Sequence, residues 1–277
     1  MTYLSAIILG LVQGIAEFLP ISSSGHLSIF QNFFQLTDVE HDHLFFDVLL
    51  HLGTLVAVFI AYRRDIAELL REFFYMVHLK RLPQGGKPDV PARRTILMII
   101  VATLPLFLIL PVKDLVEGLY QNTFFIAFAL AVTGLLLFLS DRMNRGTKTA
   151  RNATMLDALL VGVAQAVAVV PGLSRSGTTI SAGLARGFDR TFAVKFSFLL
   201  SIPAVLGANL LSIVDAAKAG IDTKLLPVYL VGVLVAMISG YAAISLLRYI
   251  ARKGRFGAFA YYCWGAGIVT LILSLIA

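Results

Sequence analysis

Two short polar stretches interrupt a chain that is otherwise strongly apolar, and they hold the residues that could do chemistry. One runs from Ser22 to His26 and the other from Pro171 to Thr179. The second places Arg175 among hydroxyl side chains and glycines, which let backbone N–H groups approach a ligand. A guanidinium fork at the start of a helix favours binding of phosphate oxygens. We interpret the stretch as an anion cradle whose members, beside the arginine, are Ser174, Ser176, Gly177 and Thr179.

Acid–base groups surround the first stretch. Gln13 and Glu17 are four residues apart, so both project from one face of a helix that leads into it. A carboxylate at membrane depth is costly unless it is paired or coordinates a cation. His26 suits proton transfer, and the hydroxyls come from Ser22, Ser23 and Ser24. Glutamate, histidine, serine and arginine that face one another indicate phosphoryl chemistry. The structural alternative is a capping turn in which Arg175 only pairs with Glu17.

The two polar stretches also belong to an internal repeat. Six identical pairs align at one constant offset: Gly10 with Gly162, Gln13 with Gln165, Ala16 with Ala168, Ser22 with Ser174, Ser24 with Ser176 and Gly25 with Gly177. Interrupted hydrophobic segments at corresponding places in two halves point to a site between them in repeat-built membrane proteins. The sequence thus predicts one integral-membrane domain, residues 1–277, with repeats at about 1–140 and 155–277.

Composition indicates a polytopic membrane protein. Hydrophobic residues make up 58% of the chain and charged residues 14%, with a mean hydropathy of +0.85. Soluble domains average about 25% charged residues. The net charge of +7 does not indicate a nucleic-acid partner, because most lysines and arginines fall in short loops, where they set membrane orientation. The single cysteine, Cys263, offers neither a disulfide nor a metal-ligand spacing.

The elements that must position the polar stretches are all helical. Half-helices are predicted at 3–19 and 22–36 and again at 155–170 and 174–187, with six full spans at 43–62, 92–112, 122–140, 190–213, 226–250 and 256–276. The basic stretch 63–94 is predicted to be a solvated cytoplasmic linker, which leaves both termini outside. The predicted fold is therefore all-α, with two inverted-topology repeats, six transmembrane helices and two re-entrant hairpins whose tips meet.

The residues also carry a family resemblance. The segment Gln13 to Pro20 followed by Ser22 to His26, together with Pro171 to Ser176 and Thr179, resembles the two signature motifs of the bacterial undecaprenyl-diphosphate phosphatases of the bacitracin-resistance type. The resemblance covers the whole chain, including its length and the order of its segments.

That resemblance implies hydrolysis of undecaprenyl diphosphate to undecaprenyl phosphate and inorganic phosphate, which recycles the lipid carrier for cell-wall synthesis. It implies a multi-pass protein of the bacterial inner membrane, a site open to the periplasmic side, and dependence on a divalent cation, Mg²⁺ or Ca²⁺. Carried over by position, the functional residues are Glu17, Ser23, His26, Ser174, Arg175, Ser176 and Thr179. Many relatives have glutamate at position 13, so Gln13 is the weaker of two metal ligands with Glu17.

Three alternatives stay open at this stage. A polyprenyl-phosphate flippase or transporter could use the same repeat architecture. The attacking group could be Ser23, His26 or a metal-bound water. Asp47 and His51, on one face of the first full span, could orient site residues or a cation, or form a plain interhelical contact. Partners expected are the polyprenyl lipid and the bilayer; a homodimer is left open.

Overall fold

The computed structural model describes residues 1–34, 40–78, 87–143, 146–219, 223–253 and 256–276. All the regular elements among these residues are helices, and no strand is found among them. The first half contains α1 (Tyr3–Phe18), α2 (Ser23–Phe34), α3 (Glu40–Ala61), α4 (Arg63–Met76), α5 (Val90–Thr103), η1 (Leu104–Val112), α6 (Lys113–Gly118), η2 (Leu119–Gln121) and α7 (Thr123–Asp141). The second half contains α8 (Met155–Val167), α9 (Arg175–Ala185), α10 (Arg190–Ala219), η3 (Thr223–Leu225), α11 (Leu226–Lys253) and α12 (Gly257–Ile276).

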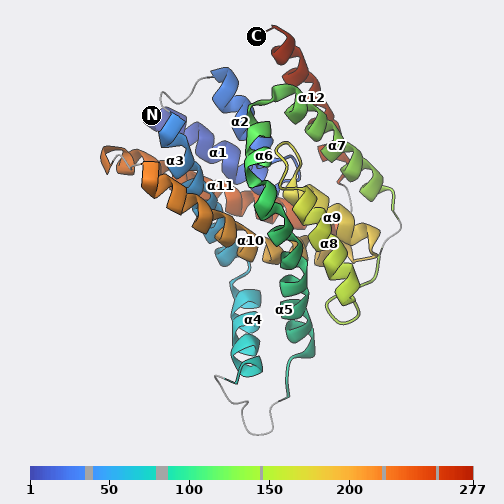
Figure 1. Ribbon diagram of the computed structural model, residues 1–277. Helices are drawn as coiled ribbons and strands as arrows, with labels where there is room; N and C mark the ends of the chain where they lie inside the picture. The colour runs from blue at the N-terminus through green and yellow to red at the C-terminus, as the bar shows by residue number, and fades with distance from the viewer. Residues whose placement is uncertain (35–39, 79–86, 144–145, 220–222, 254–255, 277) are drawn as a thin grey trace.

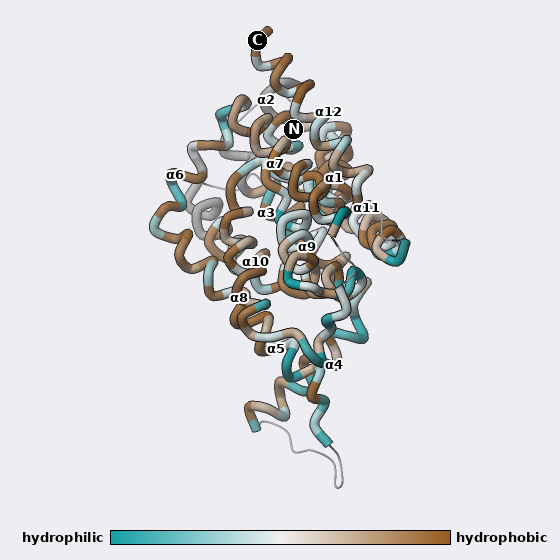
Figure 2. Tube along the Cα trace, turned by 90° about the vertical axis from the view of Figure 1, so that its right-hand side faces the viewer, coloured by the Kyte–Doolittle hydropathy of each residue, from teal (hydrophilic) through white to brown (hydrophobic). Residues whose placement is uncertain are grey.

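The helix lengths confirm a multi-pass membrane protein. Among the described residues, five helical segments are long and apolar enough to cross a bilayer: Val90–Val116, Thr123–Asp141, Arg190–Ile213, Leu226–Lys253 and Gly257–Ile276. A sixth span results if α3 and α4 count together, although they bend by 85° at their junction. Figure 2 shows the hydrophobic colour along much of α8 and α10 and hydrophilic segments around α4.

The linker predicted at 63–94 is partly wrong. It begins with α4, a helix of 14 residues, and α4 and α5 run side by side below the rest of the bundle (Figure 1). The Arg93 Nε atom donates to Glu72 Oε2 at 3.0 Å and joins the two helices. Asp89 caps α5 by accepting from the Ala92 N–H at 3.0 Å, and this hydrogen bond lowers the pKa of its carboxyl group. The helix α4 is amphipathic, and its many charged residues led to the prediction of a loop from the sequence.

Both interrupted pairs are confirmed as short helices flanking a break. The first break lies between α1 and α2, and the second between α8 and α9. Neither α1, with 16 residues, nor α8, with 13, reaches the length of about 20 residues that a span requires. The chain reverses at each break through a left-handed residue, Ser22 (φ 72°) in the first and Gly172 (φ 87°) in the second.

Aligned glycines bring the first helix of each pair close to a long neighbour. A Cβ at Gly10 would lie 2.5 Å from the carbonyl oxygen of Gly232 in α11, and one at Gly14 would lie 2.0 Å from Ser239 Oγ. At Gly162 in α8 a Cβ would lie 2.4 Å from the Ala102 carbonyl oxygen in α5. Close backbone approach through small residues is how membrane helices associate tightly. It fixes α1 and α8, and therefore the two breaks, against the bundle.

Candidate active site

Helix α1 presents the first pair of site residues. Thr2 caps it by accepting a hydrogen bond from the Ser5 N–H at 3.1 Å. Gln13 and Glu17 lie one turn apart, and Gln13 Nε2 donates to Glu17 Oε2 at 3.1 Å. Both side chains are buried, with 0% and 8% exposure. The spacing therefore does what the sequence predicted, since it places both side chains on one inward face.

Glu17 is the point where four helices meet. Its Oε2 accepts from Ser23 Oγ of α2 at 2.7 Å, and its Oε1 forms an ion pair with Arg175 Nη2 of α9. His51 Nε2 of α3 lies 3.9 Å from Oε2. The structure thus brings together Glu17, Ser23 and Arg175, three of the four groups predicted to meet; the imidazole beside Glu17 is that of His51, for which the sequence left two interpretations. Asp47 orients that imidazole, because its carbonyl oxygen lies 2.8 Å from His51 Nδ1.

The first polar tip is a serine-capped turn. Ser22 Oγ accepts from the Gly25 N–H at 3.2 Å and lies 3.4 Å from Ser24 Oγ. Ser22 is almost fully buried, whereas Ser23 and Ser24 keep partial exposure. The cap aligns the first N–H groups of α2 and leaves Ser23 at its first residue, directed at Glu17.

The second tip has the same cap. Ser174 Oγ accepts from the Gly177 N–H at 3.1 Å and lies 3.2 Å from Ser176 Oγ. Thr179 Oγ1 lies 2.6 Å from Ser197 Oγ and also donates to the Arg175 carbonyl oxygen at 2.8 Å. Both Ser174 and Thr179 are 1% exposed. These hydroxyls hold the turn together, and the positive end of the α9 dipole lies at this turn.

The two tips touch. Ser176 Oγ donates to the Leu19 carbonyl oxygen at 3.4 Å. A Cβ on Gly25 would lie 3.1 Å from Gly172 Cα, and one on Gly177 would lie 3.2 Å from Pro20 Cβ. Residues more than a hundred positions apart thus form one polar cluster, which the repeat predicted.

His26 was predicted to face Glu17 and Ser23, but both of its ring nitrogens have other hydrogen-bond partners. Its Nδ1 lies 2.7 Å from the Ser22 carbonyl oxygen, and its Nε2 lies 2.8 Å from the Tyr262 hydroxyl. Because a carbonyl only accepts, Nδ1 carries the proton and donates it. Nε2 then accepts from Tyr262, whose ring stacks on the imidazole at 5.6 Å between centroids and 12° between planes.

Sequence reasoning missed three supporting side chains. Tyr262 comes from α12, Thr133 from α7 and Ser197 from α10. Thr133 Oγ1 accepts from the Ser174 N–H at 3.1 Å and donates to the Gly172 carbonyl oxygen at 3.2 Å, which fixes the second tip. Each lies outside the two polar stretches, and no spacing relates it to a motif. Only the packing of the helices reveals it.

Arg175 carries the feature that points most directly to an anion. Its Nη2 pairs with Glu17, while its Nη1 is buried and has no hydrogen-bond partner in the described part of the chain. An unsatisfied buried donor is costly, and more so on a charged group. A phosphate oxygen in this position would satisfy it, and guanidinium groups bind such oxygens in bidentate fashion.

Gln13 and Glu17 are the residues that could hold a divalent cation. Glu17 supplies a carboxylate, and Gln13 Oε1 is buried without a partner among the described residues. Mg²⁺ is usually held by one or two carboxylates together with substrate phosphates, and Ca²⁺ also takes oxygen ligands. The described residues contain no group of three or more His, Cys, Asp or Glu placed to hold a metal. The Glu17 carboxylate and Gln13 Oε1 are therefore the groups that could hold a cation, and the substrate would supply its remaining ligands.

Comparison with known proteins places this cluster in a family. The family model described as Bacitracin resistance protein BacA matches residues 6–269. The chain belongs to the BacA family. Both polar tips and Glu17 lie inside the matched range, and among the site residues described above only the capping residues Thr2 and Ser5 lie outside it. The range that matches the BacA family model therefore includes the whole cluster around Glu17, and also Tyr262 of α12.

Relatives in the BacA family are similar along their full length. An undecaprenyl-diphosphatase of Alkaliphilus metalliredigens is 41% identical over 278 residues, covering 100% of each chain. Another from Carboxydothermus hydrogenoformans is 43% identical, covering 99% of this chain and 98% of its own. A third, from Methanobrevibacter smithii, is also 43% identical, covering 99% of both.

Proposed function

We propose that this BacA-family chain is a membrane undecaprenyl-diphosphate phosphatase. It hydrolyses the phosphoric anhydride of undecaprenyl diphosphate to give undecaprenyl phosphate and inorganic phosphate. The full-length relatives bear that activity in their names. The observation that carries the proposal is Arg175, which pairs with Glu17 through one nitrogen and keeps the other buried and unsatisfied between two serine-capped tips.

The terminal phosphate is bound by Arg175 and by the N-terminal end of α9. Arg175 Nη1 and the backbone N–H groups of Arg175 and Ser176, which begin α9, supply donors, and the helix dipole favours the negative charge. Ser24 and Ser176 offer hydroxyls beside them. These are positioning and charge-stabilising roles, which dominate catalysis of phosphoryl transfer.

The reaction breaks the bond between the terminal phosphorus and the bridging oxygen, which leaves on undecaprenyl phosphate. Water supplies the new oxygen of inorganic phosphate. Ser23 is the side chain whose proton already has an acceptor, because its hydroxyl donates to Glu17 at 2.7 Å. His26 Nε2, which faces the Tyr262 hydroxyl, is the atom that can take up or deliver a proton. A divalent cation held by Glu17 and Gln13 would neutralise charge on the diphosphate.

The membrane arrangement completes the proposal. Six spans and two re-entrant hairpins form two inverted repeats in the bacterial inner membrane, with the site open to the periplasm. Support comes from the lysines and arginines, of which 19 of 23 fall at or between the ends of the predicted spans on one side of the membrane. A reporter fused after Ala277 should then be periplasmic, and one inserted between Gly85 and Gly86 should be cytoplasmic. Two reporters on the same side would overturn this topology.

The activity is tested with purified protein in detergent. We expect release of inorganic phosphate from undecaprenyl diphosphate, lost when a chelator removes divalent cations and restored by Mg²⁺ or Ca²⁺. A flippase has no transmembrane gradient or second leaflet in detergent, so a protein that binds the lipid without releasing phosphate would favour the transport alternative. The matched negative control is Glu17→Gln, with helix content checked by circular dichroism.

A further inference from the structure

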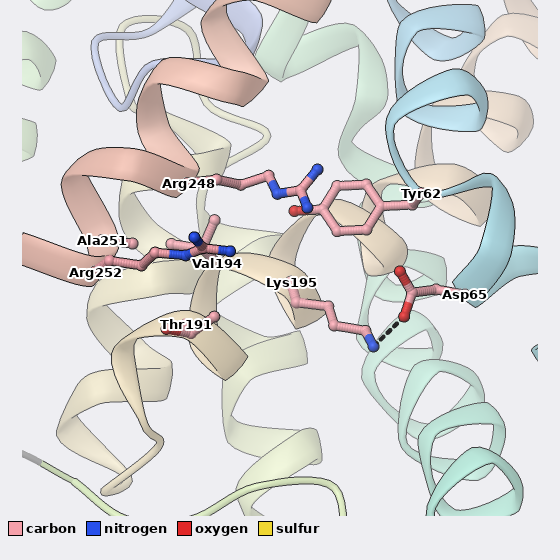
Figure 3. A pocket seen from close by; sticks show the side chains of 8 residues that line it. All are labelled: Tyr62, Asp65, Thr191, Val194, Lys195, Arg248, Ala251 and Arg252. Atoms are coloured by element: carbon pink, nitrogen blue, oxygen red, sulfur yellow. Dashed lines mark hydrogen bonds and ion pairs between the residues drawn. The ribbon is translucent and has the colours of Figure 1, made fainter.

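A basic pocket lies away from the two tips, at the end of the bundle where α4 begins. It has a volume of about 240 Å³. Figure 3 shows it between the junction of α3 and α4, the N-terminal turns of α10 and the last turns of α11. Its lining consists of Tyr62, Asp65, Thr191, Val194, Lys195, Arg248, Ala251 and Arg252. None of these residues belongs to the cluster around Glu17.

The pocket carries an excess of positive charge. Three of its lining residues are basic and one is acidic. Lys195 forms an ion pair with Asp65, so these two charges cancel. Arg248 has only a long hydrogen bond of 3.4 Å to the Ala61 carbonyl oxygen, and no ion pair joins Arg248 or Arg252 to an acidic residue within the described part of the chain. Two guanidinium groups are therefore left to bind an anion.

Packing holds the side chains on one wall of the pocket in place before any ligand binds. The Tyr62 ring lies under the Arg248 guanidinium, whose central carbon is 5.2 Å from the ring centroid. Tyr62 is itself 3% exposed and packs edge-on against Phe198 at 5.9 Å between centroids. Val194 is 1% exposed. Stacking restricts Arg248 to one side of the pocket, and a restricted arginine loses less conformational entropy when it binds.

An apolar track leads from the arginines along α11. Positions 234, 238, 241, 245, 248 and 252 recur every three or four residues and so share one helix face. Leu234, Ile238 and Tyr241 on this face are 52%, 65% and 46% exposed. Ser245 follows, and then the two arginines, all exposed. The face changes along its length from apolar to strongly basic, which matches a molecule with hydrocarbon at one end and negative charge at the other.

We propose that this pocket binds the phosphate group of an anionic phospholipid, with its acyl chains along the exposed face of α11. The phosphodiester lies between Arg248 and Arg252, and the hydrocarbon covers Leu234 and Ile238. A basic pocket between transmembrane helices is a recognised way to bind an anionic headgroup. A volume of about 240 Å³ is small for a drug-sized ligand but sufficient for a phosphate group. Free phosphate would leave the apolar track unexplained.

Native mass spectrometry of the purified full-length protein tests the proposal. The protein is incubated with phosphatidylglycerol or with phosphatidylcholine of the same acyl chains. We expect retention of phosphatidylglycerol to fall about tenfold in the double variant Arg248→Gln with Arg252→Gln, since losing two charge-assisted contacts removes at least the equivalent of one decade in affinity. The control is Arg71→Gln with Arg151→Gln, which removes the same charge at two exposed positions outside the pocket.

Three outcomes would overturn the proposal: equal loss in both double variants, equal retention of the two lipids by the unsubstituted protein, or displacement of the bound lipid by millimolar inorganic phosphate. The last would assign the pocket to free phosphate. Phosphate release from undecaprenyl diphosphate serves as the folding control, and we expect it to stay within about twofold in the pocket variant. Should the double variant fail to fold, Arg252→Gln alone at its exposed position is measured against Arg151→Gln, and equal retention by these two would also overturn the proposal.

Discussion

The two polar tips are built alike and equipped differently. In each, a serine caps the following helix by accepting from the glycine N–H three residues later, at 3.2 Å for Ser22 and 3.1 Å for Ser174. In each, a second serine hydroxyl lies beside the first, at 3.4 Å and 3.2 Å. The aligned positions between these shared residues differ. The repeat keeps the turn, whereas the reactive groups occupy the positions at which the halves diverge.

Three divergent pairs account for the cluster. Glu17 aligns with Val169, Ser23 with Arg175, and His26 with Thr178. The consequence is visible at the aligned glutamines, of which Gln13 donates to Glu17 whereas Gln165 has both side-chain polar atoms buried and unsatisfied among the described residues. The first half contributes the acid–base groups, and the second contributes the positively charged guanidinium group of Arg175. A complete site needs both tips, because Glu17 and Arg175 meet only across their contact.

The largest effect is expected at Glu17. Glu17→Gln should abolish turnover, because a neutral amide replaces the carboxylate that accepts from Ser23 and pairs with Arg175, which leaves that arginine buried without a counter-charge. Cation dependence should weaken at the same time. Phosphate release measured against Mg²⁺ concentration checks both. Val169→Ala, the aligned control, should retain activity and its cation response; loss there would mean that both halves contribute acid–base chemistry.

The second-largest effect on turnover is expected for Arg175→Lys. A lysine keeps the charge but lacks the fork that contacts Glu17 and a phosphate oxygen together. We expect a loss of about 2 to 5 kcal/mol in transition-state stabilisation, or roughly 30-fold to several-thousand-fold in kcat/KM. Arg186→Lys is the control, because Arg186 bonds to Asp157 at 2.9 Å, away from the tips. Near-normal turnover of Arg175→Lys would make the arginine a structural partner of Glu17.

A third comparison separates Ser23 from His26. Ser23→Ala should lower kcat at least about a hundredfold, as expected for loss of a group in proton transfer or attack. Tyr262→Phe should lower it only about tenfold, the equivalent of one hydrogen bond to His26. Rapid quenching without acid checks for phosphohistidine. A trapped phosphohistidine, with slowed but measurable hydrolysis by Ser23→Ala, would make His26 the attacking group, whereas full activity of His26→Ala would exclude it.

The smallest effect is expected at Gln165. Gln165→Leu replaces a buried, unsatisfied amide with an apolar side chain of similar size, so the free energy of unfolding should rise by about 1 kcal/mol or stay unchanged. Phosphate release should not change. The aligned variant Gln13→Leu should instead lower activity, because it removes a hydrogen bond to Glu17. Thermal unfolding in detergent and phosphate release are the two measurements. A large loss of activity in Gln165→Leu would show that the second tip holds a polar ligand of its own.

The parts of this molecule that the sequence predicted are those encoded locally. Gln13 and Glu17 share a helix face by spacing alone, and the aligned polar stretches predict a break between two short helices in each half. Contacts that depend on tertiary packing were out of reach. Tyr262 reaches His26 from the last helix, and Thr133 reaches the second tip from α7, although neither has a neighbour in the sequence that marks it. The helix α4 was predicted to be a linker because its charges hide an amphipathic pattern.

The glycine contacts of α1 limit how this protein can change over evolution. What blocks a side chain at Gly10 is the Gly232 carbonyl oxygen. At Gly14 the Ala236 carbonyl oxygen would lie 2.6 Å from an added Cβ, and it remains there even if Ser239 is shortened. These are backbone atoms, so no second substitution can remove them. A lineage that loses either glycine must therefore shift a whole helix, and that shift would carry Glu17 away from Arg175. Substitutions can therefore accumulate on the exposed side of α1, whereas positions 10 and 14 must remain glycine.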